Sequence, residues 1–133
     1  MKSLLLLLFV LAVASGIGLY LKGSTGAIKR KRRLRITPTE LGSGYGDRAT
    51  IVQFSTTFCS SCRAAKGLIK DVVKDQSDIK YLEIDAESNL ELVRRVDIKS
   101  TPTTLFLDKD GFEIARATGA PKRDQLIKVV ASL

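Results

Sequence analysis

The stretch TIVQFSTTFCSSC, residues 50–62, contains the pattern on which the fold prediction rests. Its first half, Thr50–Ser55, is rich in β-branched and aromatic residues, which indicates a buried strand. From Cys59 to Asp75, apolar side chains recur at helical spacing and basic side chains occupy the other face. The pattern therefore predicts a strand, a short turn and an amphipathic helix, with two cysteines where the turn meets the helix.

Segments of strand and helix character alternate through the rest of the body. Strands are expected at Lys80–Ile84, Thr104–Leu107 and Phe112–Ala117, and helices at Asn89–Arg95 and Lys122–Leu133. Asp110-Gly111 is a strong hairpin signal between the last two strands, and Thr37-Pro38-Thr39-Glu40 is typical of a capped single helical turn. This order predicts an α/β domain over residues 36–133, with a mixed sheet and helices on both faces.

The two cysteines, Cys59 and Cys62, lie where a helix N-terminus would lower a thiol pKa. Unpaired amide groups and the helix dipole stabilise negative charge there, so the thiolate fraction rises near neutral pH. Cys59 is the outer residue and is the predicted nucleophile. Cys62 follows one helical turn later, where its sulfur can reach Cys59 and release a mixed disulfide, so it is the predicted resolving thiol.

Three plainer interpretations of the pair remain open. The cysteines could form a structural disulfide, although so small a loop constrains the unfolded chain little. They could be two unrelated buried thiols, or two chains could each contribute the pair to a shared metal site. With no His and only two Cys, one chain cannot assemble an ordinary zinc or iron-sulfur site from its own soft ligands, so no metal or other cofactor is expected.

The positive charge of the chain is concentrated at its start. The formal net charge is +8, residues 1–35 contain eight Lys/Arg and no acid, and the remainder carries 14 basic and 14 acidic residues. A nucleic-acid-binding domain needs basic charge on its folded surface. The neutral body therefore argues against nucleic acid as a partner.

The N-terminal segment is long and apolar enough to cross a membrane. Nineteen residues without charge, Ser3–Leu21, would form a helix about 28 Å long, close to the thickness of a bilayer core. We expect a single-pass anchor over residues 1–22. The alternative is a cleavable signal peptide with Ala12-Val13-Ala14 as its cleavage site, but the apolar run continues past Ala14 and is followed by seven basic residues.

Those basic residues predict the topology. Lys and Arg near the end of a membrane helix favour the cytoplasmic side, so the body is expected to face the cytoplasm. Residues 23–35 are expected to be a basic juxtamembrane linker, flexible over its Gly/Ser/Thr-rich beginning. The linker could also bind anionic lipid headgroups, in addition to fixing topology.

Several separated features of the body resemble the thioredoxin family. They are Cys59-Ser60-Ser61-Cys62 after a strand, Ile84-Asp85 ending the next strand, Thr101-Pro102-Thr103 beyond a helix, and Gly119 after the final strand. The resemblance implies a thioredoxin-like fold in which Pro102 follows a cis peptide bond and lies beside the cysteines. It also implies that Thr101 and Pro102 bind substrate, with Phe58, Ser60 and Ser61 as further contacts. The plainer interpretation of Pro102 is a proline that opens an edge strand.

The chain departs from the family pattern in three places. Phe58-Cys59-Ser60-Ser61-Cys62 stands where Trp-Cys-Gly-Pro-Cys is common, so the family's redox potential cannot be carried over. Gln53 occupies the place of a buried acid and cannot exchange a proton with Cys62, which leaves water as the expected proton acceptor. The usual first strand and helix are expected to be reduced to Leu34–Thr37 and a single turn.

The leading hypothesis is a membrane-anchored thiol-disulfide oxidoreductase that reduces disulfide-containing protein substrates in the cytoplasm. The family resemblance implies a thioredoxin-reductase-type flavoenzyme, or another reductant, as its electron donor. One alternative is an extracytoplasmic or secreted reductant or oxidant in an envelope pathway such as cytochrome maturation. Another is a non-enzymatic binding module that the dithiol switches.

Overall fold

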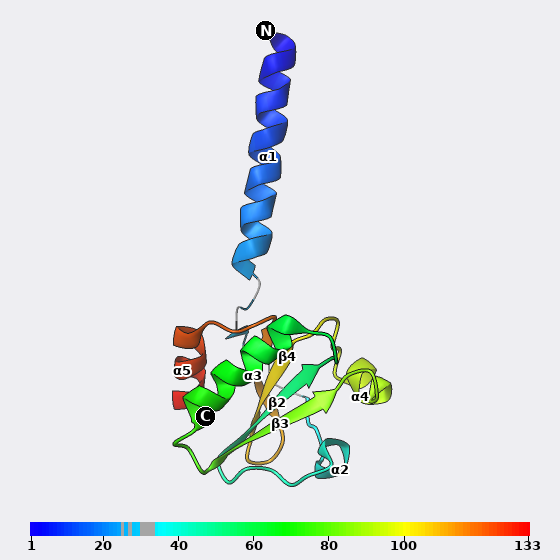
Figure 1. The fold of residues 1–133 in the computed structure, drawn as a ribbon, viewed down its shortest axis with the longest axis vertical. Coiled ribbons are helices and arrows are strands. Elements are labelled where there is room, and N and C mark those ends of the chain that lie inside the picture. The colour runs from blue at the N-terminus through cyan, green and yellow to red at the C-terminus, as the bar shows by residue number, and fades with distance from the viewer. Residues whose placement is uncertain (25, 27, 30–33) are drawn as a thin grey trace.

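A computed structural model of the 133-residue chain describes residues 1–24, 26, 28–29 and 34–133. Helix α1 (Lys2–Ser24) rises from a domain in which helices flank a central sheet, as Figure 1 shows. Among the described residues, one helical segment, Lys2–Lys22, is long and apolar enough to cross a membrane, and none of it is buried against the domain. The predicted α/β fold is confirmed.

The sheet is mixed and has the order β1-β5-β4-β2-β3. Strands β2 and β3 are parallel, and the pairs β2/β4, β4/β5 and β1/β5 are antiparallel. The strands are β1 (Ile28–Lys29), β2 (Ala49–Ser55), β3 (Ile79–Asp85), β4 (Thr103–Asp108) and β5 (Glu113–Thr118). The remaining helices are α2 (Pro38–Leu41), α3 (Ser60–Val73), α4 (Leu90–Arg95) and α5 (Arg123–Ala131).

The predicted elements after residue 49 are present, with ends that differ by one or two residues. The last strand begins at Glu113 and not at Phe112, because the Phe112 amide donates to the carboxylate of Asp108 in the hairpin turn (2.9 Å). Gly111 adopts a φ of 84° in that turn, a conformation that glycine tolerates. The last helix ends at Ala131, because the Ser132 amide turns back to the carbonyl of Val129.

Strand β2 is the centre of the core, since all seven of its residues are buried. Ile51 packs with Ile69 of α3 and Leu126 of α5 on one face of the sheet. Val52 and Phe54 belong to a second cluster on the other face, which includes residues of α2 and α4. Alternation of side chains along the strand thus places one helical layer on each face.

The structure differs from the predicted juxtamembrane linker in the part of residues 23–35 that it describes. Helix α1 continues to Ser24, two residues beyond the expected anchor, and Ile28–Lys29 forms β1 against Ala117 and Arg116 of β5. This pairing covers backbone groups of β5 that would otherwise form a free sheet edge. The expected flexible tether is therefore partly fixed to the domain, while the basic run at residues 30–33 lies outside the described residues.

The strand expected over Leu34–Thr37 is reduced to one bridge, between Arg35 and Phe112. The single turn that follows is present as α2, and Thr37 caps it as expected: its hydroxyl accepts from the Glu40 amide, and the Glu40 carboxylate accepts from the Thr37 amide (2.8 Å). Ile36 is fully buried in the core, so this short entry segment is anchored by packing as well as by its cap.

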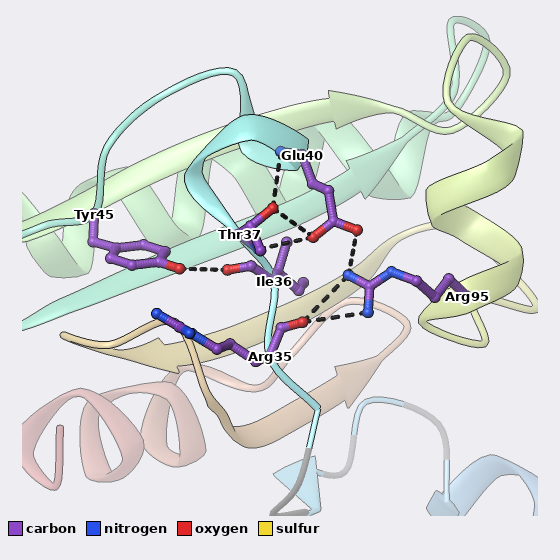
Figure 2. Close-up of polar contacts among 6 residues, drawn as sticks. All are labelled: Arg35, Ile36, Thr37, Glu40, Tyr45 and Arg95. Atoms are coloured by element: carbon purple, nitrogen blue, oxygen red, sulfur yellow. Dashed lines mark hydrogen bonds and ion pairs between the residues drawn. The ribbon is translucent and has the colours of Figure 1, made fainter.

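Figure 2 shows how polar contacts fasten this entry segment. Arg95 of α4 forms an ion pair with Glu40 and donates two hydrogen bonds to the carbonyl of Arg35, each 3.3 Å long. The hydroxyl of Tyr45 donates to the carbonyl of Ile36 (2.7 Å). A turn of four residues thereby replaces the longer start that the family resemblance implies.

The lowered pKa of the Glu40 carboxyl group predicts that the stability of the fold depends on pH. Burial would raise its pKa, but hydrogen bonds from Thr37 and the contact with Arg95 outweigh burial and lower the pKa below 4.5. A carboxyl group with a lowered folded-state pKa stabilises the fold above its unfolded pKa, and this contribution disappears as pH falls through the folded pKa. We expect Glu40→Gln to reduce the free energy of unfolding at pH 7 by about 1 kcal/mol.

Urea denaturation of the two proteins from pH 7 to pH 3 measures this difference. The difference in their free energies of unfolding should disappear below pH 4.5, as Glu40 becomes protonated in the parent protein. Glu91→Gln, at an exposed carboxylate of α4, is the matched control and should change stability less. A gap that stays constant down to pH 3 would contradict the proposed role of the Glu40 charge.

Candidate active site

The two cysteines lie at the end of β2 and the start of α3, as the sequence predicts. Cys59 is the N-cap residue of α3, with extended backbone, and Cys62 lies in the first turn. They form a disulfide with their Cα atoms 5.2 Å apart. Cys62 is 3% exposed, whereas Cys59 is partly exposed. Cys59 is thus the sulfur that is more accessible to a second molecule.

Three donors surround the sulfur of Cys59. The backbone amide of Cys62 donates to it at 3.2 Å, the hydroxyl of Ser61 lies 3.4 Å away, and the hydroxyl of Thr101 lies 3.9 Å away. The amide belongs to the first turn of α3, where the helix dipole also favours negative charge. Donors so placed would favour a thiolate on Cys59 once the disulfide is reduced, and the role of Cys59 as the nucleophile stays a prediction.

The Thr101–Pro102 peptide bond is cis, and Pro102 is buried directly after Thr101, whose hydroxyl lies near the sulfur of Cys59. The hydroxyl of Thr101 contacts that of Thr56 at 3.3 Å, which ties the start of β4 to the turn after β2. The carbonyl of Pro102 accepts a hydrogen bond from the amide of Gly119 (2.8 Å). Three chain segments far apart in sequence therefore meet next to the disulfide.

A groove of about 500 Å³ lies along these segments. Its lining includes Ser61, Thr101, Pro102, Thr118 and Ala120. Ser60 and Ser61 are exposed, and the Phe58 side chain is 99% exposed just before Cys59. The structure thus places Ser61, Thr101 and Pro102 together in the groove, with Phe58 and Ser60 on the accessible surface nearby. Their roles in binding substrate stay predictions.

Behind the cysteines, Gln53 occupies a fully buried position in β2. Its side-chain amide donates to the hydroxyl of Ser55 and to the carbonyl of Cys62, each at 2.9 Å. Its oxygen accepts a hydrogen bond from the hydroxyl of Tyr81 at 2.9 Å. Gln53 therefore positions the first turn of α3 through neutral hydrogen bonds and provides no group that titrates.

A second pocket, which both cysteines line, contains charged side chains. The pocket, about 410 Å³, also has Lys66, Glu83 and Asp85 in its lining. Lys66 and Glu83 form an ion pair of 2.9 Å. Sequence reasoning missed Glu83. The signal was its register: Glu83 is the partner of Gln53 in the parallel β2/β3 pair, so the two residues occupy equivalent positions on neighbouring strands.

The hydroxyl of Tyr81 links the buried amide to this carboxylate, because it also lies 3.3 Å from Glu83. Burial raises the pKa of Tyr81 well above its ordinary value, and the charge of Glu83 raises it further. Tyr81 consequently remains a protonated donor at physiological pH. The pair Gln53 and Tyr81 thus forms a polar connection that carries no charge of its own.

Asp85 ends β3 at the same edge of the sheet and shapes the following turn. Its carboxylate accepts hydrogen bonds from the hydroxyl of Ser88 and from the amide of Glu87, which lower its pKa. Within the described residues, no group of three or more His, Cys, Asp or Glu is arranged to hold a metal ion. A metal site shared through the cysteines would have to draw its other ligands from a second chain.

Comparison with known protein families gives a match over most of the domain. The family model described as Thioredoxin matches residues 43–132. A thioredoxin from Pongo abelii is 29% identical over 77 residues, which are 58% of this chain and 73% of that protein. An H-type thioredoxin from Picea mariana is 30% identical over 86 residues, 65% of this chain and 67% of that protein. These sequences are similar to the part of the chain that contains the cysteine pair.

Solved structures agree with the sequence matches. The germline-specific thioredoxin Deadhead of Drosophila melanogaster has a TM-score of 0.58 and 27% identity, covering 65% of this chain and 82% of that one. A thioredoxin from Nicotiana alata has a TM-score of 0.58 and 26% identity, covering 65% of this chain and 73% of that one. Sequence and structure therefore point to the same family.

The donors around Cys59 predict the acidity of its thiol. In a Cys62→Ser background, we expect Thr101→Val and Ser61→Ala each to raise the pKa of Cys59, because each removes a hydroxyl that favours the thiolate. The pH dependence of alkylation by iodoacetamide measures this pKa. Ser60→Ala, at the neighbouring exposed serine, is the matched control. Equal pKa values in all these variants would show that the hydroxyls do not tune the thiol.

Proposed function

This chain belongs to the thioredoxin family of oxidoreductases, and from that premise we propose that it is a membrane-anchored protein-disulfide reductase with Cys59 and Cys62 as its working dithiol. The observation that carries the proposal is the position of Cys59: partly exposed, at the start of α3, with its sulfur surrounded by three donors. This environment favours the attacking form of the thiol.

In the proposed reaction, the Cys59 thiolate attacks one sulfur of a substrate disulfide. A bond forms between Cys59 and that sulfur, and the other substrate sulfur leaves as a thiolate that takes up a proton. Cys62, as a thiolate, then attacks the sulfur of Cys59 and releases the second substrate thiol. Two electrons pass from the dithiol to the substrate, and the chain is left with the Cys59–Cys62 disulfide.

Cys62 has to lose its proton before the second step, and we propose that the pocket in front of it receives that proton. Gln53 cannot accept it, because its side chain is a neutral amide. The pocket is lined by Cys62 together with the polar side chains of Glu83 and Asp85, so solvent that enters it meets the thiol and can carry the proton away. In this scheme, water inside the pocket is the proton acceptor, as the sequence predicts.

The groove beside Thr101 and Pro102 is the proposed binding site for the substrate chain. Its position next to the disulfide would place an extended segment within reach of Cys59. Phe58, almost fully exposed, is a further proposed contact. Reduction consumes the dithiol, so the reaction needs an external reductant of the thioredoxin-reductase type or another dithiol donor.

Membrane attachment through α1 is the second part of the proposal. The segment Lys2–Lys22 has the length and composition of a span, and a signal sequence would have both properties too. The concentration of basic residues after this segment favours a cytoplasmic domain. In a reducing cytoplasm, the useful direction of the exchange is reduction of the substrate.

Activity assays on cysteine variants test the proposed chemistry. We expect Cys59→Ser to lower the rate of insulin reduction at least about a thousandfold, because the attacking thiolate is lost. Cys62→Ser should instead accumulate a mixed disulfide with the substrate, visible on a non-reducing gel, because nothing releases it. If the parent chain reduces no disulfide, and if the Cys59→Ser variant binds the partner as well as the parent chain does, the protein is a redox-switched binding module.

Labelling of the cysteines in cells tests the topology. A membrane-impermeant thiol reagent, applied after mild reduction, should label the full-length band only after the cells are lysed. Labelling of that band in intact cells would reverse the orientation and favour an envelope pathway. A shortened band with no residues 1–14, released from the membrane fraction, would identify a cleaved signal peptide.

A further inference from the structure

The chain enters the domain at the rim of the substrate groove. The amide of Gly26 donates a 2.7 Å hydrogen bond to the carbonyl of Thr118, and Ile28–Lys29 then pairs with β5. Thr118 is itself part of the groove lining. The segment that follows the proposed anchor therefore touches the active-site groove directly.

This contact depends on glycine at position 26. Its φ is 80°, and a Cβ atom there would lie 2.5 Å from the carbonyl oxygen of Ala120, a second residue of the groove lining. Any other residue would have to move away from that oxygen. Two residues later, Ile28 packs against the buried core of the α3/α5 face. Gly26 and strand β1 are thus fixed in position by close approach and by packing.

The groove and the anchor lie on the same side of the domain. In Figure 1, the N-terminal end of α3 and the chain between β5 and α5 are on the side from which α1 rises. Thr118 is the register partner of Thr103, directly after Pro102, so the rim contacted by Gly26 continues to the cis proline. Ser61 completes the same groove next to Cys59.

Very little chain separates the anchor from this rim. Ser24 ends α1, and one residue lies between it and Gly26, a reach of at most about 7 Å. A domain of about 100 residues is roughly 35 Å across. The side on which the anchor enters therefore decides whether the dithiol works near the bilayer surface or tens of ångströms away from it.

We propose that the substrates are membrane proteins whose disulfides lie in extended segments close to the bilayer surface. This inference rests on the proposed reductase function and on α1 acting as an anchor. Chain connectivity holds the groove beside the membrane, where a juxtamembrane disulfide reaches Cys59 at a high effective concentration. Lys122, exposed two residues after Ala120 of the groove lining, adds positive charge near this rim, where anionic headgroups would lie.

Reduction rates at two heights above a bilayer test the proposal. The full chain is reconstituted into vesicles with a transmembrane peptide that carries a quenched fluorescent disulfide either directly after its helix or after a spacer of about 20 prolines, which extends it by roughly 60 Å. A soluble peptide with the same disulfide is the third substrate. We expect the membrane-proximal disulfide to be reduced at least tenfold faster than the distant one.

The matched control is a variant with about 30 Gly/Ser residues inserted between Ser24 and Gly26, which gives a flexible reach of about 30 Å. It should reduce the soluble peptide at the parental rate and show a height ratio close to one. Equal rates at both heights for the parent chain would overturn the inference and leave the reductase function intact. No reduction of the soluble peptide would overturn the reductase function itself.

A second measurement tests the geometry without using activity. A fluorophore on Cys59 in the Cys62→Ser chain should be quenched strongly by vesicles that carry headgroup quenchers. The reference position is Ser77→Cys in a Cys59→Ser/Cys62→Ser chain, an exposed site in the turn before β3 at the other end of the sheet. Quenching should be at least threefold stronger at Cys59. Stronger quenching at position 77 would contradict the inferred orientation.

Discussion

The complete burial of β2 is the constraint on which the site depends. With all seven residues buried and helices on both faces, a shift of register by one residue would move each side chain of the strand from one core cluster into the other, where the packing is different. Its parallel partner β3 ends at the same edge of the sheet, and its antiparallel partner β4 begins there. Cys59 follows β2, Asp85 is the last residue of β3 and Pro102 directly precedes β4, so a hydrophobic constraint in the core brings the residues of the site together at the rim.

The electrostatics of the site separate the two sulfurs. Cys59 receives donors from the helix start and from two hydroxyls, whereas Cys62 is almost fully buried and has a neutral amide behind it. A carboxylate in the place of Gln53 would have to be desolvated, which is costly in a fully buried position. Here the negative charge is one strand away, on Glu83, where solvent and Lys66 compensate it. The fold therefore keeps its buried network neutral and its titratable groups at the pocket surface.

The sequence was informative wherever the signal was local. The strand and helix around Cys59, the capped turn at Thr37 and the Asp110-Gly111 hairpin each follow from a few neighbouring residues. Two features escaped because they depend on contacts between distant residues. The pairing of Ile28 with Ala117 has no local pattern in a Gly/Ser/Thr-rich segment, and the place of Glu83 beside the cysteines follows only from the β2/β3 register.

Ile28 is the residue that holds strand β1 in position on the domain. Ordering each backbone residue costs about 1–2 kcal/mol, and each hydrogen bond contributes only about 0.5–1.5 kcal/mol net. The bonds made by Gly26 and by the two residues of β1 therefore offset only part of the entropy lost in ordering them. Burial of part of the Ile28 side chain against the core adds a further contribution of about 1 kcal/mol or more. Packing of Ile28 thus adds to the hydrogen bonds of Gly26 and β1 in keeping one face of the domain toward α1.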